Sequence, residues 1–230
     1  MKYVIALLSG MLVGGALFLL LLYHNPFAGN PSLSPLLVSG QKLIELSYSP
    51  APAEAIALTN NGEVSVPPVP HGVDELWEPS VSKTRVLVTQ MIDVRGAPAG
   101  IGIKFSSDSE QTRLLNADAI VDSAWHIWLP ERGSLFVNQT ENLWTYLRNV
   151  VVPARLSSSD DWRGTWFGIT TSGPGALGTG RVTGGSGEFA GFTSEAVESL
   201  SARAWSVDGG PVAVTGSLTI SLLQAPDPAD

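Results

Sequence analysis

The chain has 230 residues, a formal net charge of −8 and no cysteine. The lack of cysteine excludes a disulfide scaffold, a thiol nucleophile and a cysteine-ligated metal site. The acidic balance, without any cluster of lysine and arginine, argues against a nucleic-acid partner, because phosphate binding needs a concentrated basic surface.

Residues 3–23 form an apolar run without a charged residue. As an α-helix, which rises about 1.5 Å per residue, this run reaches about 30 Å, the thickness of a bilayer core. A cleaved signal peptide has a shorter apolar region of about 7–15 residues and a small-x-small cleavage site. Here the run ends at Tyr23, which suits the interfacial aromatic belt. We predict an uncleaved transmembrane anchor over residues 1–23; the alternative is cleavage that leaves a mature N-terminus near residue 29.

The charges that flank this run predict its orientation in the membrane. Lys2 and the amino terminus are the positive groups on the short side, and the next cation is Lys42. The positive-inside rule therefore places the N-terminus in the cytoplasm and the rest of the chain outside it, with the periplasm as the expected compartment. Gly10 and Gly14 have the G-x-x-x-G spacing that lets two membrane helices approach closely, so a helix partner is possible there.

After the anchor, the composition predicts three segments. Residues 24–41 are rich in proline and glycine and form the expected linker. Residues 42–223 are long enough for one domain. Residues 224–230 form a C-terminal tail.

Short segments with β propensity, separated by glycine- and proline-rich turns, fill the predicted domain. The expected strands are 42–48, 55–58, 83–93, 101–105, 118–129, 134–137, 162–171, 196–206 and 212–222. One amphipathic helix is expected over residues 141–151, with Thr140 as its N-cap and Pro153 as its end. Many short strands with one helix indicate a closed barrel or a sandwich. We predict a mainly β protein: a single antiparallel β-barrel with one short amphipathic helix, preceded by a transmembrane helix.

Glycines near the C-terminal strands carry a resemblance to a known family. Gly185, Gly187, Phe189 and Gly191 fit a G-x-G-x-[FY]-x-G corner, which precedes the hairpin GPVAVTGSLTIS. This segment resembles the C-terminal strands of allene oxide cyclase-type and dirigent-type β-barrels. The resemblance implies an eight-stranded cup, and some such barrels cyclise or orient apolar substrates. No catalytic residue of that family has a counterpart in this chain, so none is transferred.

The stretch Trp125–Trp128 is the most suggestive one for chemistry. On a strand, Trp125 and Ile127 share one face, and His126 and Trp128 share the other. We expect His126 and Trp128 to line a closed cavity inside the barrel. A neutral imidazole in such an aromatic pocket would suit proton transfer near pH 7, so His126 is the candidate catalytic residue. The alternative is a hydrogen-bonded core histidine beside packing tryptophans. The candidate ligand-binding side chains are Trp125, Trp128, Trp144 and Trp166.

These observations predict a membrane-anchored, extracytoplasmic β-barrel that binds a small apolar molecule and, if it is an enzyme, isomerises or cyclises it. The alternative is a non-catalytic accessory or scaffold subunit of a membrane complex. We expect no metal, because H-E-x-x-H is absent and the three histidines lie far apart in the sequence. We expect no cofactor either, since the glycines of residues 178–191 match no nucleotide-binding loop.

Overall fold

A computed structural model describes residues 2–24, 42–51, 55–58, 64–65 and 84–223. The predicted linker and the C-terminal tail therefore lie almost wholly outside the described residues. The strands are β1 (Lys42–Tyr48), β2 (Ala55–Leu58), β3 (Val64–Ser65), β4 (Thr84–Asp93), β5 (Pro98–Asp108), β6 (Ile120–Leu129), β7 (Gly133–Asn142), β8 (Asp161–Ile169), β9 (Thr171–Gly173), β10 (Gly180–Gly185), β11 (Thr193–Ser206) and β12 (Gly210–Leu223).

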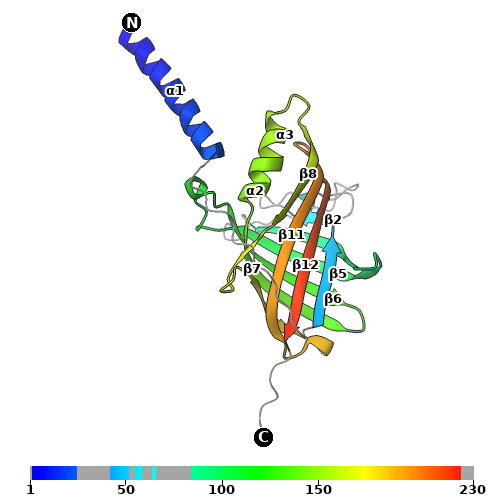
Figure 1. The fold of residues 1–230 in the computed structure, drawn as a ribbon. Coiled ribbons are helices and arrows are strands. Elements are labelled where there is room, and N and C mark those ends of the chain that lie inside the picture. The colour runs from blue at the N-terminus through cyan, green and yellow to red at the C-terminus, as the bar shows by residue number, and fades with distance from the viewer. Residues whose placement is uncertain (1, 25–41, 52–54, 59–63, 66–83, 224–230) are drawn as a thin grey trace.

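The fold is a closed antiparallel barrel of eight strands. The strand order is β1-β12-β11-β10-β7-β6-β5-β4, and the pairing of β1 with β4 closes the ring. Strand β8 pairs with β11, β9 pairs with β7, and β2 joins β4. Strands β11 and β12 extend beyond the ring and, with β8, form a three-stranded projection (Figure 1). The predicted fold class is confirmed.

The N-terminal helix α1 (Lys2–His24) projects away from the barrel (Figure 1). Its segment Lys2–Leu21 has a mean hydropathy of 2.5 and is not buried against any other part of the protein. Within the described residues, this is the one helix long and apolar enough to cross a membrane; a signal sequence has the same character. Five short helical elements lie in the barrel domain. They are η1 (Leu114–Asn116), α2 (Trp144–Tyr146), η2 (Leu147–Val151), α3 (Val152–Leu156) and η3 (Gly187–Phe189).

The predicted amphipathic helix is present, but both of its expected ends are wrong. Thr140 belongs to β7, which runs on to Asn142, so the helical segment begins at Trp144. Pro153 does not end the segment, which continues to Leu156. The chain passes through the wider π-type turn of η2 just before Pro153, which lies in the first turn of α3.

Two hydrophobic clusters divide the core. The first fills the barrel, and its larger members include Trp125, Met91, Ile127, Leu135 and Phe189. The second lies beneath the helical segment 144–156 and is built from Val150, Ala154, Trp166, Ala202, Trp205 and Val214. The helix therefore covers the inward-facing side of the β8-β11-β12 projection, as its apolar stripe predicts.

Glycines make room for large side chains at two points of this core. A Cβ added at Gly216 would overlap the ring of Tyr48, so glycine lets that ring lie flat against β12. Gly187 and Gly191 have φ values of +63° and +77°, which favour glycine, and they flank the fully buried Phe189. The expected role of these glycines in a tight strand corner is confirmed.

Candidate functional site

Six side chains inside the barrel form a group that we call the interior polar centre. They are Tyr48 from β1, Lys104 from β5, Trp125 from β6, Gln139 and Glu141 from β7, and Glu198 from β11. Successive residues of a strand point to opposite faces, and each of these positions falls on the face that points into the barrel. The barrel wall thus brings together residues that are far apart in the sequence.

Glu198 accepts hydrogen bonds on both carboxylate oxygens. Lys104 Nζ lies 2.7 Å from its Oε1, which also accepts the Tyr48 hydroxyl. Trp125 Nε1 lies 2.9 Å from its Oε2, which also accepts the side-chain amide of Gln139. The side chain of Glu198 is 0% exposed, so these four donors replace the water that its carboxylate would otherwise bind.

Glu141 is the second carboxylate of the interior polar centre. Its Oε1 lies 2.7 Å from Lys104 Nζ and accepts the hydroxyl of Ser123. One ammonium therefore bridges two buried carboxylates. If all three groups are ionised, the centre holds one uncompensated negative charge, so the pKa values of the two glutamates separate.

The environment shifts these two pKa values in opposite directions. Burial raises the pKa of Glu141, and the nearby Glu198 carboxylate raises it further, which outweighs the lowering by Lys104. Burial also raises the pKa of Glu198, but the Lys104 ammonium and the donors Tyr48 and Trp125 outweigh it, so that pKa is lowered. For Lys104, burial lowers the pKa, but the two carboxylates raise it above its usual range. Glu141 is therefore the member of the centre that takes up a proton first.

The hydroxyl of Thr171 holds two members of the interior polar centre in position. The Thr171 hydroxyl donates to Gln139 Oε1 at 3.1 Å and accepts the backbone N–H of Glu198 at 2.7 Å. Lys104 is only 8% exposed, and apolar side chains of the barrel cluster fill the rest of the interior. This arrangement can hold a proton and can lock five strands together, but its polar atoms already form hydrogen bonds with one another.

The structure places the predicted site residues in different parts of the molecule. Trp125 is buried in the barrel and bonded to Glu198. His126 and Trp128 lie on the outward-facing side of β6, where Trp128 is half exposed and His126 stacks on Phe136 with ring centroids 4.5 Å apart. The expectation that His126 and Trp128 line the interior is therefore wrong, because strand alternation gives the inside to Trp125 and Ile127. The catalytic role of His126 stays a prediction.

Trp144 and Trp166 are also separate from the barrel interior. Trp166 belongs to the cluster beneath the helical segment, where it contacts Tyr146 with ring centroids 5.2 Å apart. Trp144 begins the helical segment itself. The four tryptophans thus do not form one pocket wall.

The outward side of β5, β6 and β7 carries an apolar surface that we call the outer aromatic face. It consists of Ile101, Phe105, His126, Trp128 and Phe136. Ile101 lies directly opposite Trp128 in the sheet, and His126 lies opposite Phe136, so the patch is continuous across three strands. Ile101, Phe105, Trp128 and Phe136 are each between 43% and 50% exposed.

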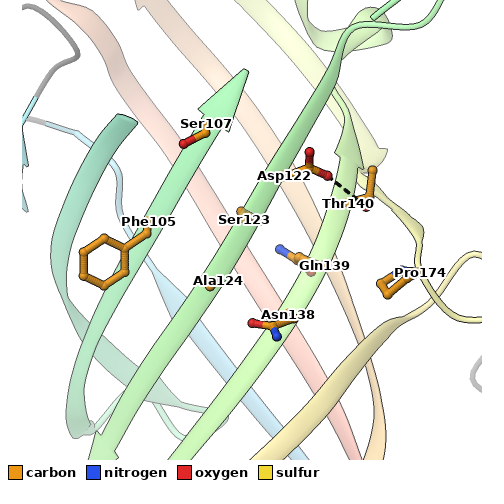
Figure 2. Close-up of a pocket in the computed structure, with 9 residues that line it drawn as sticks. All are labelled: Phe105, Ser107, Asp122, Ser123, Ala124, Asn138, Gln139, Thr140 and Pro174. Atoms are coloured by element: carbon orange, nitrogen blue, oxygen red, sulfur yellow. Dashed lines mark hydrogen bonds between the residues drawn. The ribbon is translucent and has the colours of Figure 1, made fainter. Parts of the chain in front are cut away.

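A shallow depression of about 410 Å³ continues this face beyond Phe105 (Figure 2). It is lined by Phe105, Ser107, Asp122, Ser123, Ala124, Asn138, Gln139, Thr140 and Pro174. Asp122 accepts a hydrogen bond from the Thr140 hydroxyl at 3.2 Å, so its carboxylate is held at the surface. The depression is open to solvent and lies on the wall of the barrel, not within it.

Sequence reasoning missed Lys104, Glu141 and Glu198. The segment Ile101–Phe105 alternates isoleucine and phenylalanine with glycine and lysine, and such a pattern normally points its apolar residues inward. Here Lys104 points inward and the apolar residues point outward. A signal that could have indicated these buried groups is a single charged residue within a segment of high β propensity.

Comparisons with protein-family models and with curated proteins find no match for this chain.

Proposed function

We propose that this chain is a membrane-tethered scaffold protein without catalytic activity, in which the outer aromatic face pairs with the same face of a second copy. In this proposal, α1 anchors the chain in the membrane with its N-terminus in the cytoplasm, and the barrel lies outside it. The barrel acts as a rigid body whose wall supplies the contact.

The single observation that carries this proposal is the outer aromatic face itself. Large apolar side chains from three adjacent strands lie together in solvent, although monomeric proteins seldom expose large contiguous apolar patches. Aromatic residues are enriched at the centres of protein interfaces, and interfaces between identical subunits are the most apolar. Trp128 lies opposite Ile101 and, at 50%, is more exposed than Ile101, Phe105 or Phe136, which makes it the expected anchor of the contact.

Two further features favour a second copy over another partner. A two-fold symmetric contact needs only one patch, because the same surface serves both subunits. Within the described residues, no atom lies within 4 Å of a Cβ built at Gly10 or Gly14, which leaves that face of α1 open.

A small apolar ligand inside the barrel is less well supported. Apolar side chains such as Met91 and Phe189 fill much of the barrel. The polar atoms of the interior polar centre form hydrogen bonds with one another, so they are not available to a ligand. The resemblance to cyclase-type barrels remains a prediction about fold.

Native mass spectrometry of the full chain in mild detergent tests the proposal. We expect a dimer for the wild-type protein, and we expect W128S and F136S to shift it to the monomer. Truncation of a central aromatic anchor costs about 2 kcal/mol, or roughly thirtyfold in the dissociation constant. The matched control is F167S, because Phe167 on β8 is 67% exposed and lies off the outer aromatic face. G14L measures the contribution of the anchor.

A wild-type monomer, or a dimer that W128S and F136S leave intact, would overturn the pairing. A wild-type complex of fixed stoichiometry with a different protein, lost in W128S but kept in F167S, would instead establish the accessory-subunit alternative.

A further inference from the structure

Among the residues that the structure describes, two buried N–H groups of the helical segment 144–156 have no hydrogen-bond partner: Trp144 Nε1 and Arg148 Nε. The two residues are four positions apart, so they lie on one face of the helix. Native proteins pair nearly all buried donors, since an unpaired one has lost its water without compensation. Two such donors on one face of the helix indicate that an acceptor from outside the described residues belongs there.

The charge of Arg148 identifies the kind of acceptor. Within the described part of the chain, the ion pairs of arginine involve Arg85, Arg95 and Arg132, so the positive charge of Arg148 is not neutralised by a carboxylate there. A guanidinium and an indole N–H together suit an anion with several oxygens, and guanidinium geometry matches phosphate especially well.

The position of Arg148 relates this acceptor to the membrane. The guanidinium carbon of Arg148 lies 5.5 Å from the ring centroid of Tyr23, in the last turn of α1. Tyrosines at the end of a membrane-spanning helix lie at the level of the lipid headgroups. With α1 in the membrane as proposed, the helical segment that carries Trp144 and Arg148 lies at the depth of the lipid phosphates, since it is on the side of the domain where α1 ends (Figure 1).

We propose that Trp144 and Arg148 form a phosphate-binding site, with the phosphodiester of a phospholipid headgroup as its ligand. The site uses the Trp144 indole N–H and the Arg148 guanidinium as donors, and the phosphate oxygens accept. It rests on the proposed insertion of α1 in the membrane, but it is independent of the outer aromatic face. Free inorganic phosphate has the same chemistry and is the other source that the test must separate.

The test is a titration of the full chain, in maltoside detergent, with dihexanoyl phosphatidylglycerol below its critical micelle concentration. Native mass spectrometry counts the bound lipid. We expect one saturable lipid site in the wild-type protein, and we expect R148Q and W144F each to weaken it about tenfold. R155Q is the matched control, because Arg155 is an exposed arginine of the same helical segment. Near-UV circular dichroism checks that each variant keeps the native fold.

The outcomes are distinct. Lipid binding that R148Q and W144F weaken, and that millimolar inorganic phosphate does not displace, supports the headgroup as the ligand. Displacement by inorganic phosphate supports a site for the free anion. No saturable binding, or equal binding by R148Q, W144F and R155Q, overturns the proposal. The F136S variant should bind lipid normally, so a failure of the scaffold proposal would not be mistaken for a failure of this one.

Discussion

The ammonium of Lys104 lies 2.7 Å from the carboxylate of Glu198 inside the barrel, although the two residues are 94 positions apart in the sequence. Strand β5 supplies the lysine and β11 supplies the glutamate, so the contact crosses the barrel interior instead of following one pair of strands. An ion pair in this position constrains how the wall closes, because both charges are buried and neither has water as a substitute.

Substitution of Lys104 by methionine should destabilise the protein by about 3–5 kcal/mol. The change keeps the apolar stem but leaves Glu141 and Glu198 without their shared ammonium. Urea unfolding of the full chain in detergent, followed by near-UV circular dichroism, measures the loss. K104M/E141Q should recover part of it, because one of the two unpaired carboxylates is then neutral.

The control for K104M is R85Q. Arg85 and Asp108 form an exposed pair on the barrel surface, with nitrogen and oxygen 3.0 Å apart. Such pairs contribute about 0–1 kcal/mol, so R85Q should unfold almost as the wild-type protein does. Equal losses in K104M and R85Q would mean that the buried ion pair does not stabilise the barrel.

The two glutamates should give the free energy of unfolding opposite dependences on pH. Burial is the chief cause that raises the pKa of Glu141 in the folded state. The stabilisation by Glu141 is therefore fully present below pH 4.5, its ordinary pKa, and is lost as pH rises through the pKa of the folded state. The pKa of Glu198 is lowered, because the Lys104 ammonium outweighs the effect of burial. The stabilisation by Glu198 is therefore present above pH 4.5, its ordinary pKa, and is lost as pH falls through the pKa of the folded state.

Denaturant titrations from about pH 2 to about pH 8 cover both windows and separate the two effects. Relative to the wild-type protein, E141Q should become more stable as pH rises, because it no longer loses a proton inside the barrel. E198Q should be most destabilised at neutral pH. Parallel pH profiles for the wild-type protein and E141Q would contradict the assignment of the proton to Glu141.

Gly216→Ala should destabilise the protein by about 1–3 kcal/mol, the usual cost of overpacking. The new methyl group would overlap the Tyr48 ring, which must then move away from Glu198 and weaken their hydrogen bond. Thermal unfolding measures the effect. Gly209→Ala is the control, because the nearest atom to its added Cβ is Ser206 Cβ at 3.9 Å and nothing has to move.

Val150→Ala should destabilise the protein by about 1–3 kcal/mol, because it leaves a cavity in the cluster beneath the helical segment. Val150 is fully buried there beside Ala202 and Trp205. Leu156→Ala, in the exposed last turn of α3, should have little effect. Similar melting temperatures for V150A and L156A would show that the helix is not held by this cluster.

The sequence predicted the architecture better than the site, and the reasons are physical. Strands and turns depend on local patterns, and the glycines around Phe189 indicated a corner that is present. The direction in which a strand faces depends on the whole barrel. Ile101 and Trp128 look like core residues in the sequence, yet the register that pairs them turns both outward.

The helix illustrates the same limit at its ends. Its apolar face was predictable from the spacing of residues such as Leu147 and Val151. Its start was not, because Thr140, Glu141 and Asn142 are held in β7 by pairing with β6 and β9. Tertiary pairing therefore overrides the local N-cap signal, and Glu141 is drawn into the barrel interior instead of the first turn of a helix.

Leu200 packs against both hydrophobic clusters, since it faces inward on β11 where the barrel ends and the projection begins. The helical layer and the barrel consequently share one side chain as a common support, and loosening either one removes packing from the other. Heating should therefore melt both in a single cooperative transition, and the slowest-exchanging amides should run along β11 through the junction rather than stop at it.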